Sequence, residues 1–510
     1  MPDTSLRLHN TLSRQPEPVE PAQRDAEGHP MLRVYGCGPT VYSLAHIGNF
    51  RSFLTTDLLL RTARALGWRT RYVSNVTDVG HLTDDDVADA QGQDKLAKAL
   101  QSKEGQRFAN VWDLARHYTG ALVADWQALN LLEPDVRPRA TEHVREQIRA
   151  VETLIERGHA YETADGVYFH VPSFPDYGKL SGNRDAEGLA TGAAGATREV
   201  VTDEAKRDPR DFALWKKDPG HLMQWHSPFA EGTPWGFPGW HIECSVMAQQ
   251  YLGETIDVHT GGEDLIFPHH ECEIAQAESL TGKPFARTWL HTRFLQVEGE
   301  KMSKSKGNFI TVRDLIEERG IDPLAVRYAL ISGHYRKPLN FTEKNLQAAA
   351  KLVARIRHAY DVLIPQAELR QDEPRDEDHA LGELLDEAYD NALAGLCDDL
   401  NTPIALREVL AGVGHLSAHD LNRTSAHHAK AFLDKVNALL GIVQHEGQGA
   451  PLGETDAFAE QVEALVAERV EARKARDFAR ADALRDELDA LGVEVMDTPQ
   501  GSTWRRRPTV

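Results

Sequence analysis

The chain has 510 residues, of which 41% are hydrophobic and 26% are charged, and it carries a formal net charge of −21. This length suffices for two to four domains, and no apolar run reaches the roughly 18 residues that a membrane helix needs. The first 30 residues are polar and lack the apolar core of a signal peptide, so they predict a flexible extension of a cytoplasmic protein. The net charge argues against a broad nucleic-acid-binding surface but leaves room for a local basic patch.

The first elements along the chain predict a βαβ unit. Residues 31–36 are typical of a short buried strand. Apolar residues then recur at helical spacing over residues 49–66, and Gly67 indicates the end of that helix. A second strand is expected over residues 70–76. A strand, a helix and another strand in succession predict a parallel sheet, and hence a Rossmann-like α/β fold.

The remaining elements divide the chain into an α/β half and a mostly helical half. The α/β half is expected over residues 31–340, with an insertion at roughly 115–210. Charged amphipathic patterns over residues 341–445 predict a helical bundle. A linker with Gly and Pro then leads to a small separate domain over residues 455–510.

One motif, Pro-Thr-Val-Tyr-Ser-Leu-Ala-His-Ile-Gly-Asn over residues 39–49, lies between the first strand and the first helix. Parallel sheets bind ligands at the carboxyl ends of their strands, and helix N-termini favour phosphate. Gly48 would let the backbone approach a ligand, while His46 and Asn49 can donate hydrogen bonds to phosphate oxygens. The motif alone is more typical of an ordinary turn with a surface histidine.

A second motif, Lys-Met-Ser-Lys-Ser-Lys-Gly-Asn, occupies residues 301–308. Three lysines with two serines and a glycine suit a loop that grips a polyphosphate and places positive charge where the transition state gains negative charge. The alternative is a solvated basic loop, which is the usual explanation for an arbitrary lysine cluster. The order of the residues in this string is more specific than that.

Together the two motifs resemble the nucleotide-binding pair of class I aminoacyl-tRNA synthetases. The resemblance implies that His46, Gly48, Asn49 and Lys304 bind ATP. It also implies that His46, Asn49, Lys301 and Lys304 are the catalytic residues. The family usually has His where this chain has Asn49; asparagine keeps a hydrogen-bond donor but cannot become charged.

A metal site is the third expectation. Its candidate ligands are dispersed along the chain: Cys37, Cys244, His269 and Glu273. Two thiolates, one imidazole and one carboxylate form a sound tetrahedral set for zinc. His269 and Glu273 are four residues apart, so on a helix they share a face. Spacing alone does not reveal the site, and His270 and Cys272 remain rival ligands by residue type.

Three segments carry a closer resemblance. They are Cys-Gly-Pro-Thr-Val-Tyr from residue 37, Trp-His-Ile-Glu-Cys-Ser from residue 240 and Phe-Pro-His-His-Glu-x-Glu from residue 267. These segments resemble the cysteinyl-tRNA synthetase family. The resemblance implies that one Zn²⁺ is held by the four ligands named above. The chain departs from this family at Cys272, where the family commonly has Asn.

The same resemblance suggests where the small substrates bind. Residues 257–265 are similar to the family's Gly-rich stretch along the adenosine and substrate pocket, which assigns Gly262 and Asp264 to ATP. Thr40 and Trp240 are expected beside the cysteine substrate. Trp240 is equally well explained as a core residue.

The implied function is the ATP-dependent activation of L-cysteine and its transfer to tRNA(Cys), with Mg²⁺ accompanying ATP. The helical half and the last domain would bind tRNA, and a monomer without membrane contact is expected. One alternative is a ligase that transfers the same adenylate to an amino sugar, but such an enzyme would lack the helical half. The other alternative is a non-enzymatic binder, against which Lys304 and the complete ligand set argue.

Overall fold

The computed structural model of the chain describes residues 5–84, 91–183, 206–302 and 307–444 and, near the C-terminus, residues 465–466, 468–469, 472, 477–490, 493–498 and 501–506. The chain divides into two compact units, residues 1–444 and residues 445–510. Among the described residues, no helix is both long and apolar enough to cross a membrane.

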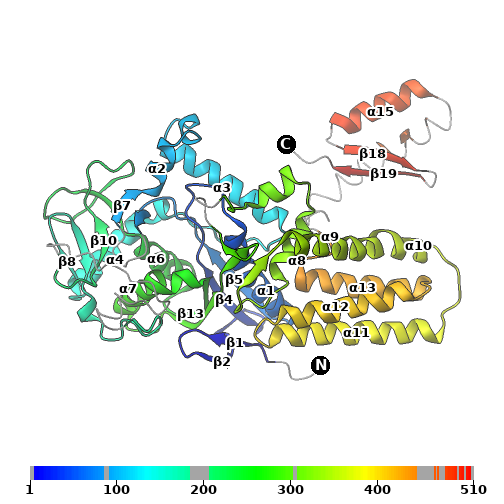
Figure 1. Ribbon diagram of the computed structural model, residues 1–510, viewed down its shortest axis with the longest axis horizontal. Coiled ribbons are helices and arrows are strands. Elements are labelled where there is room, and N and C mark those ends of the chain that lie inside the picture. Colours follow the sequence, from blue (N-terminus) through cyan, green and yellow to red (C-terminus); the bar gives the residue numbers. More distant parts are fainter. Residues whose placement is uncertain are drawn as a thin grey trace. The chain divides into compact units, whose positions relative to one another are not determined.

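A parallel sheet lies at the centre of the first unit (Figure 1). Its strands, in spatial order, are β14 (Ala286–Thr292), β13 (Ile256–Gly262), β4 (Pro30–Gly36) and β5 (Arg69–Ser74). A two-residue strand, β3 (Gln23–Arg24), adds to β4 in the antiparallel sense. The expected strands over residues 31–36 and 70–76 correspond to β4 and β5, and the predicted parallel α/β fold is confirmed.

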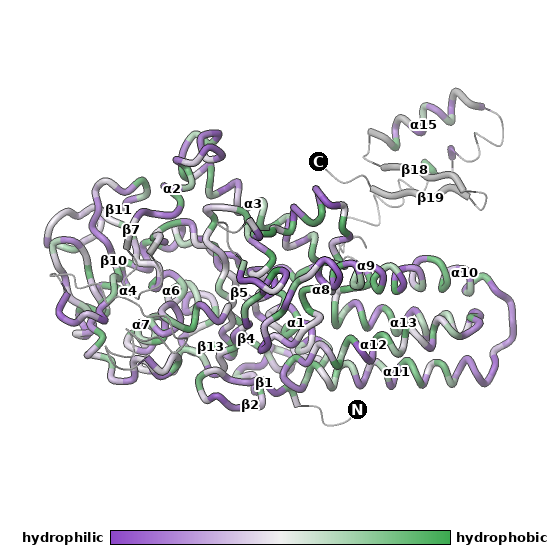
Figure 2. The backbone as a smooth tube through the Cα atoms, viewed as in Figure 1, coloured by the Kyte–Doolittle hydropathy of each residue, from purple (hydrophilic) through white to green (hydrophobic). Residues whose placement is uncertain are grey.

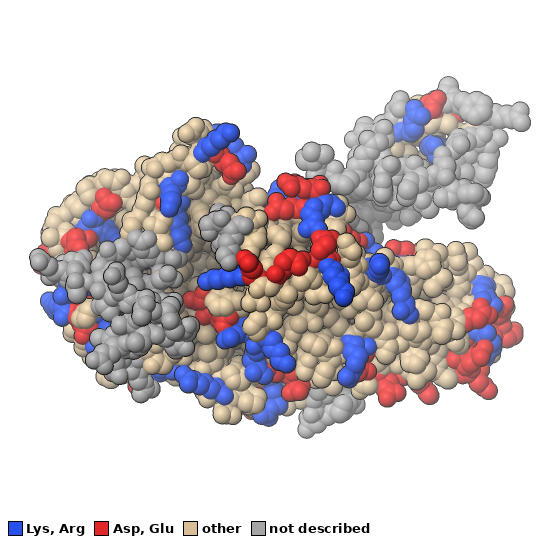
Figure 3. Space-filling view, viewed as in Figure 1, with Lys and Arg blue, Asp and Glu red and all other residues tan. Residues whose placement is uncertain are grey.

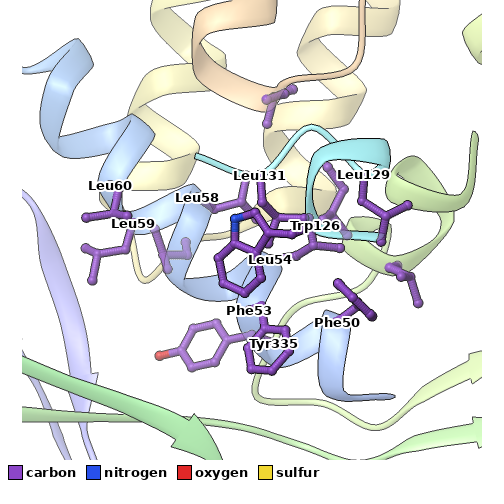
Figure 4. Packing of buried hydrophobic residues seen from close by; sticks show 14 of the residues in the cluster. Phe50, Phe53, Leu54, Leu58, Leu59, Leu60, Trp126, Leu129, Leu131 and Tyr335 are labelled. Carbon is purple, nitrogen blue, oxygen red and sulfur yellow. The ribbon is translucent and has the colours of Figure 1, made fainter. Parts of the chain in front are cut away.

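Helix α1 (Ile47–Ala65) makes the crossover between β4 and β5. It is buried along most of its length, and its Phe53 ring packs 5.1 Å from the ring of Trp126 (Figure 4). The helix ends at Ala65 with Leu66 as its C-cap, and Gly67 follows in the left-handed region with φ of +79°, as its sequence predicts. The deep burial of α1 anchors its N-terminus at the carboxyl edge of the sheet.

Two further helices carry candidate ligands to the same edge. Helix α6 (Trp240–Leu252) precedes β13, and α7 (Glu271–Thr281) connects β13 to the parallel neighbour β14. The two helices pack against each other. The short segments Glu263–Leu265 and Ile266–His270 join β13 to α7.

The region between β5 and α6 contains an antiparallel sheet with a separate hydrophobic core. Its order is β11 (Trp225–His226), β12 (Trp235–Pro238), β10 (Phe212–Lys216), β9 (Gly166–Phe169) and β8 (Ala160–Glu162). The accompanying elements are β6 (Leu82–Asp84), β7 (Gln91–Asp94), α2 (Lys95–Gln101), α3 (Val111–Ala128) and α4 (Val144–Glu156).

The N-terminal segment differs from its expectation as a flexible extension. Strands β1 (Arg7–Asn10) and β2 (Gln15–Pro18) form an antiparallel hairpin. Leu8 is fully buried, and the Asn10 side chain accepts from the Trp289 backbone N–H at 3.0 Å. Buried leucines and bonds to β14 fix this segment, although its prolines and charges suggest an unstructured one.

After β14 the chain forms a small sheet of β15 (Leu295–Val297), β16 (Glu300–Lys301) and β17 (Leu339–Phe341), with α8 (Pro323–Ile331) between. The helical region follows as α9 (Glu343–His358), α10 (Ile364–Glu368), α11 (Asp376–Cys397), α12 (Thr402–Ala418) and α13 (Arg423–Leu440). Hydrophilic and hydrophobic residues alternate along these helices (Figure 2). Charges of both signs gather at the end of the bundle near α10 and the start of α11 (Figure 3).

The described part of the second unit consists of α15 (Phe478–Ala490) and a hairpin of β18 (Val493–Thr498) and β19 (Gly501–Arg506). The two strands pair in the antiparallel sense along their full length.

Candidate active site and metal centre

Four buried side chains meet at the carboxyl edge of the parallel sheet. Cys37 directly follows β4, Cys244 lies in the second turn of α6, and His269 and Glu273 flank the start of α7. One potential ligand atom from each lies within 4.8 Å of those of the other three. These donors are dispersed along the sequence but converge because the end of β4 and the starts of α6 and α7 lie at one place.

The geometry of this cluster suits a tetrahedral zinc ion. The Sγ atoms of Cys37 and Cys244 are 3.9 Å apart. Two sulfur ligands at the usual Zn–S distance of about 2.3 Å would lie roughly 3.8 Å apart in a tetrahedron. Nε2 of His269 and Oε1 of Glu273, the other two donors, are 2.8 Å apart. The side chains present thus fit zinc by chemistry and by spacing.

A second group of donors overlaps the first. Cys37, Glu273, His259 and His270 also offer ligand atoms within 4.8 Å of one another. His270, a rival ligand from the sequence, therefore lies at the site. Cys272 does not join either group; its Sγ lies 3.6 Å from the Tyr177 hydroxyl within the core of the inserted region.

Electrostatics prepare the first group for a cation. Burial raises the pKa of the Cys244 thiol, but hydrogen bonds with Cys37 and His269 outweigh burial and bring it to about 6. Burial also opposes ionisation of Glu273, yet His259 and His269 hold the pKa of this carboxyl well below its usual range. Burial and the nearby Cys244 raise the pKa of Cys37. A divalent cation would favour loss of that remaining proton.

A layer of histidines supports the ligands from behind. His259 Nε2 lies 2.7 Å from Glu273 Oε2, and His241 Nδ1 lies 2.9 Å from His269 Nδ1. His270 Nδ1 contacts Nε2 of His291 at 2.7 Å. Outer contacts of this kind orient metal ligands and set the tautomer of a ligating imidazole.

Sequence reasoning did not assign a role to His241, His259 or His291. His241 and His259 lie within recognised segments, whereas His291 lies in β14, outside them. For the first two, that placement was the available signal, but only the fold places the three rings behind one site.

Thr40 and Trp240, the expected cysteine-binding residues, both contact His81. The Thr40 hydroxyl contacts His81 Nδ1 at 2.5 Å, and the Trp240 indole stacks on the His81 ring at 3.9 Å. The other neighbour of the indole is His269, at a centroid distance of 4.2 Å. Trp240 is partly buried and stacks on one of the four candidate donors.

His46 and Asn49 form a reciprocal cap at the start of α1. His46 Nδ1 accepts from the Asn49 backbone N–H, and Asn49 Oδ1 accepts from the His46 backbone N–H, both at 3.1 Å. Asparagine thus supplies the acceptor that closes this capping box. The motif opens the helix at the carboxyl edge of β4, where phosphate binding is favoured.

The two nucleotide-binding motifs lie against each other. A β-carbon on Gly48 would lie 3.2 Å from Cε of Met302. Just after the lysine segment, Thr311 forms a bridge with His46, and Ile310 accepts from the Ile47 backbone N–H at 3.0 Å. Contacts on both sides of residues 303–306 therefore bring the motifs together.

The remaining candidates occupy the same edge or lie outside the described residues. Lys301 is exposed, and its Nζ lies 5.5 Å from the centre of the Phe294 ring. Lys304 is one of those outside the described ranges. Gly262 ends β13, and a β-carbon there would clash with the Asp264 carboxylate. The two candidates for ATP binding therefore adjoin each other where the chain leaves β13.

Comparison with known proteins places this site in a family. The description "tRNA synthetases class I (C) catalytic domain" matches residues 25–351, and "Cysteinyl-tRNA ligase anticodon binding domain" matches residues 455–505. In solved structures, the fold is similar to that of Mycobacterium tuberculosis methionyl-tRNA synthetase in complex with methionyl-adenylate. The TM-score is 0.56 at 16% identity, over 81% of this chain and 92% of that one.

Relatives of similar length extend the match to the whole chain. The cysteine–tRNA ligase of Salinibacter ruber is 55% identical over 100% of both chains. That of Deinococcus radiodurans is 42% identical over 99% of this chain and 97% of the relative. A Thermus thermophilus cysteine–tRNA ligase is 42% identical over 98% of this chain and 99% of the relative. With its parallel sheet, adjoining nucleotide motifs and matching catalytic and anticodon-binding regions, the chain belongs to the cysteine–tRNA ligase family of class I aminoacyl-tRNA synthetases.

Proposed function

We propose that the residues described above carry out cysteine activation and transfer to tRNA(Cys), with one zinc ion held by Cys37, Cys244, His269 and Glu273. The single observation that carries this proposal is the convergence of these four buried donors beside Trp240. A zinc ion held there would bind a thiolate far more strongly than a hydroxyl and so would distinguish cysteine from serine.

Zinc would let the site distinguish cysteine from serine, which size alone does poorly. Serine and cysteine differ by one atom, and a pocket that relies on shape alone discriminates only about 10–200-fold. The stacked rings of Trp240 and His269 form one wall of the cysteine site in this proposal. Thr40, whose hydroxyl contacts His81, would also face the bound amino acid.

In the first step, the cysteine carboxylate attacks the α-phosphate of ATP. A bond forms between the carboxylate oxygen and the α-phosphorus, the bond from that phosphorus to the bridging oxygen breaks, and pyrophosphate leaves. His46 and Asn49 at the start of α1 would donate to the phosphates. Lys301 and Lys304 would stabilise the leaving pyrophosphate, and Gly262 and Asp264 would line the adenosine site. Mg²⁺ would enter with ATP.

In the second step, a hydroxyl of the terminal tRNA ribose attacks the carbonyl carbon of the adenylate, and AMP leaves. The helical region and the second unit would contact the rest of the tRNA, as the match to an anticodon-binding domain supports. A monomer in the cytoplasm, where tRNA is charged, goes with this proposal.

The test is the charging of total tRNA with labelled cysteine by the purified chain at saturating ATP. Labelled tRNA, with serine rejected, is expected. If cysteine drives pyrophosphate exchange but no tRNA is labelled, the acceptor is a small amine instead. If cysteine drives neither reaction while tRNA still binds, the chain is a non-enzymatic binder and the proposal is wrong.

The zinc assignment is tested with two cysteines of different placement. Cys244→Ser should lose bound zinc and most cysteine activation while ATP binding changes little, because only the amino-acid side of the site is altered. Cys272→Ser is the matched control, since Cys272 is equally buried but contacts Tyr177 and belongs to neither donor group. Equal zinc loss in both variants, or equal loss of ATP and cysteine binding in Cys244→Ser, would contradict the assignment.

A further inference from the structure

Arg51 is a buried arginine in α1 whose guanidinium donates to four backbone carbonyls. Its Nη1 donates to the carbonyls of Arg293 at 2.5 Å and Phe294 at 2.9 Å. Its Nη2 donates to the carbonyls of His334 at 3.1 Å and Lys337 at 2.6 Å. The residue is 2% exposed. One guanidinium thus binds two loops that are about forty residues apart in the sequence.

These two loops lead into the sheet that carries the lysine segment. Residues 293–294 immediately precede β15, and residues 334–337 closely precede β17. Strand β15 pairs in parallel with β17 and in antiparallel with β16, where Gln296 lies opposite Lys301. Arg51 therefore fixes the starting points of two paired strands, and through β15 it fixes the base of the segment that begins at Lys301.

The loop before β15 is also held from the adenosine side. The Glu263 carboxylate accepts from the Phe294 backbone N–H at 2.6 Å and forms an ion pair with Arg293 at 2.8 Å. Glu263 directly follows Gly262 at the end of β13. Residues 293–294 are therefore clamped between the helix of the first nucleotide motif and the Gly-rich stretch.

Packing alone does not account for an arginine at this position. Burial lowers the pKa of Arg51 to about 10, so placing the cation here has a cost that an apolar side chain would avoid. The guanidinium offers five donors in a rigid fork, whereas lysine offers three donors around a single nitrogen. Four carbonyls in two loops need the fork.

We propose that Arg51 is a positioning residue for adenylate formation, which holds Lys301 and its hairpin at a set distance from His46 and Asn49 at the start of the same helix. The inference rests on the proposed function, because it concerns the ATP side of that site. Arg51 lies two residues after Asn49, so one rigid turn of α1 connects the clamp to the cap. A change in the clamp would move the hairpin relative to the phosphates without touching the cysteine side.

The experiment measures cysteine-dependent ATP–pyrophosphate exchange in the full-length chain for Arg51→Lys and Arg51→Met. A displacement of about 1 Å costs roughly 100-fold in rate. We expect kcat/KM for ATP to fall about 10-fold in Arg51→Lys and about 100-fold in Arg51→Met. The KM for cysteine and the bound zinc should stay within about twofold of the unaltered chain. Because lysine keeps the charge, the loss in Arg51→Lys reports the missing fork.

Arg327→Lys is the matched control. Arg327 is also a buried arginine that donates to backbone carbonyls, those of Leu129, Asn130 and Leu440, but these lie in neither loop of the clamp. This variant should lower the melting temperature while leaving kcat/KM for ATP unchanged. A folded Arg51→Met with normal ATP kinetics, or the same ATP defect in Arg327→Lys, would overturn the inference. If the unaltered chain shows no exchange, the proposed function itself fails and the inference falls with it.

Discussion

The indole ring of Trp240 lies nearly parallel to the imidazole of His269, with centroids 4.2 Å apart and an interplanar angle of 25°. The same indole stacks on His81 at 3.9 Å and 13°. A proposed zinc ligand is therefore held in place by an aromatic contact as well as by hydrogen bonds. The contact also links the ligand to His81 and, through it, to Thr40.

Replacing Trp240 should weaken cysteine binding. Each stacking interaction contributes about 0.5–1.5 kcal/mol beyond area burial. Because the substitution removes both of them, Trp240→Ala should raise the KM for cysteine about 10-fold, and Trp240→Phe should stay within about threefold. Pyrophosphate exchange at varied cysteine gives both values. Trp235→Ala is the control, because Trp235 is an exposed tryptophan on β12 that contacts His226; an equal rise there would contradict the role of Trp240.

Substitution of His269 and of His270 distinguishes which of the two overlapping donor groups binds zinc, because each histidine belongs to only one group. If His269 is the ligand, His269→Asn should lose zinc even with excess metal. His270→Asn should still bind one zinc, with affinity about 10–100-fold weaker, since His270 contacts Cys37 and His291 from behind. Competition with a chromogenic chelator measures both. The reverse order of affinities would move the site to the second group.

The cap between His46 and Asn49 connects stability to ATP binding. Asn49→Ala removes the acceptor for the His46 backbone N–H, which should cost about 0.5–2 kcal/mol of stability. It should also lower kcat/KM for ATP by about 10-fold or more, whereas Asn49→His, the usual family residue, should retain most activity. Ser425→Ala removes the equivalent residue of the cap of α13 and should affect stability alone. Identical kinetics in the two alanine variants would refute a role for Asn49 in catalysis.

A buried ion cluster should make the first unit sensitive to acid. The Asp57 carboxylate contacts Arg61 at 2.9 Å and also Arg327, and it accepts from the Leu132 backbone N–H. Burial alone would raise the pKa of Asp57, but Arg327 and Arg61 outweigh it and hold the pKa below its ordinary value of 3.8. Because the pKa is depressed in the folded state, this stabilisation is complete above about pH 4 and is lost as the pH falls through the folded pKa.

Asp57→Asn should therefore lower the free energy of unfolding by about 3–5 kcal/mol at pH 7. The difference from the unaltered chain should shrink below about pH 4, and urea denaturation across pH values measures it. Asp386→Asn breaks an exposed ion pair with Lys435 and should cost about 0–1 kcal/mol at pH 7. A gap between Asp57→Asn and the unaltered chain that widens toward acid would have the wrong sign for this mechanism.

Those strands and helices that are determined by neighbouring residues could be predicted from the sequence. Strands β4 and β5 and helix α1 follow from apolar runs, helical spacing and Gly67, and the parallel sheet follows from their order. The convergence of Cys37 with Cys244 does not follow from spacing, because their separation of 207 positions is closed only by the assembled sheet. There the resemblance to a family supplied the grouping that periodicity could not.

The role of the supporting histidines could not be predicted from the sequence for the same reason. His81, His241, His259 and His291 come from four different segments. Although His241 and His259 lie in recognised segments, no local pattern groups the four rings. The N-terminal extension shows the opposite error. Its composition favours disorder, but buried leucines and one asparagine suffice to fix a short hairpin when they meet a preformed sheet.

The N-terminal hairpin has a practical consequence for producing shorter forms of the protein. Thr11, in the turn of the hairpin, contacts Nδ1 of His291 at 2.7 Å, and His291 contacts His270, whose Nε2 lies 3.4 Å from the Cys37 sulfur. A shortened chain that begins at Met31 would lose a segment that is polar in composition. It would nevertheless also lose the contact between Thr11 and His291. A purification tag should therefore be added before the N-terminal hairpin and should not replace it.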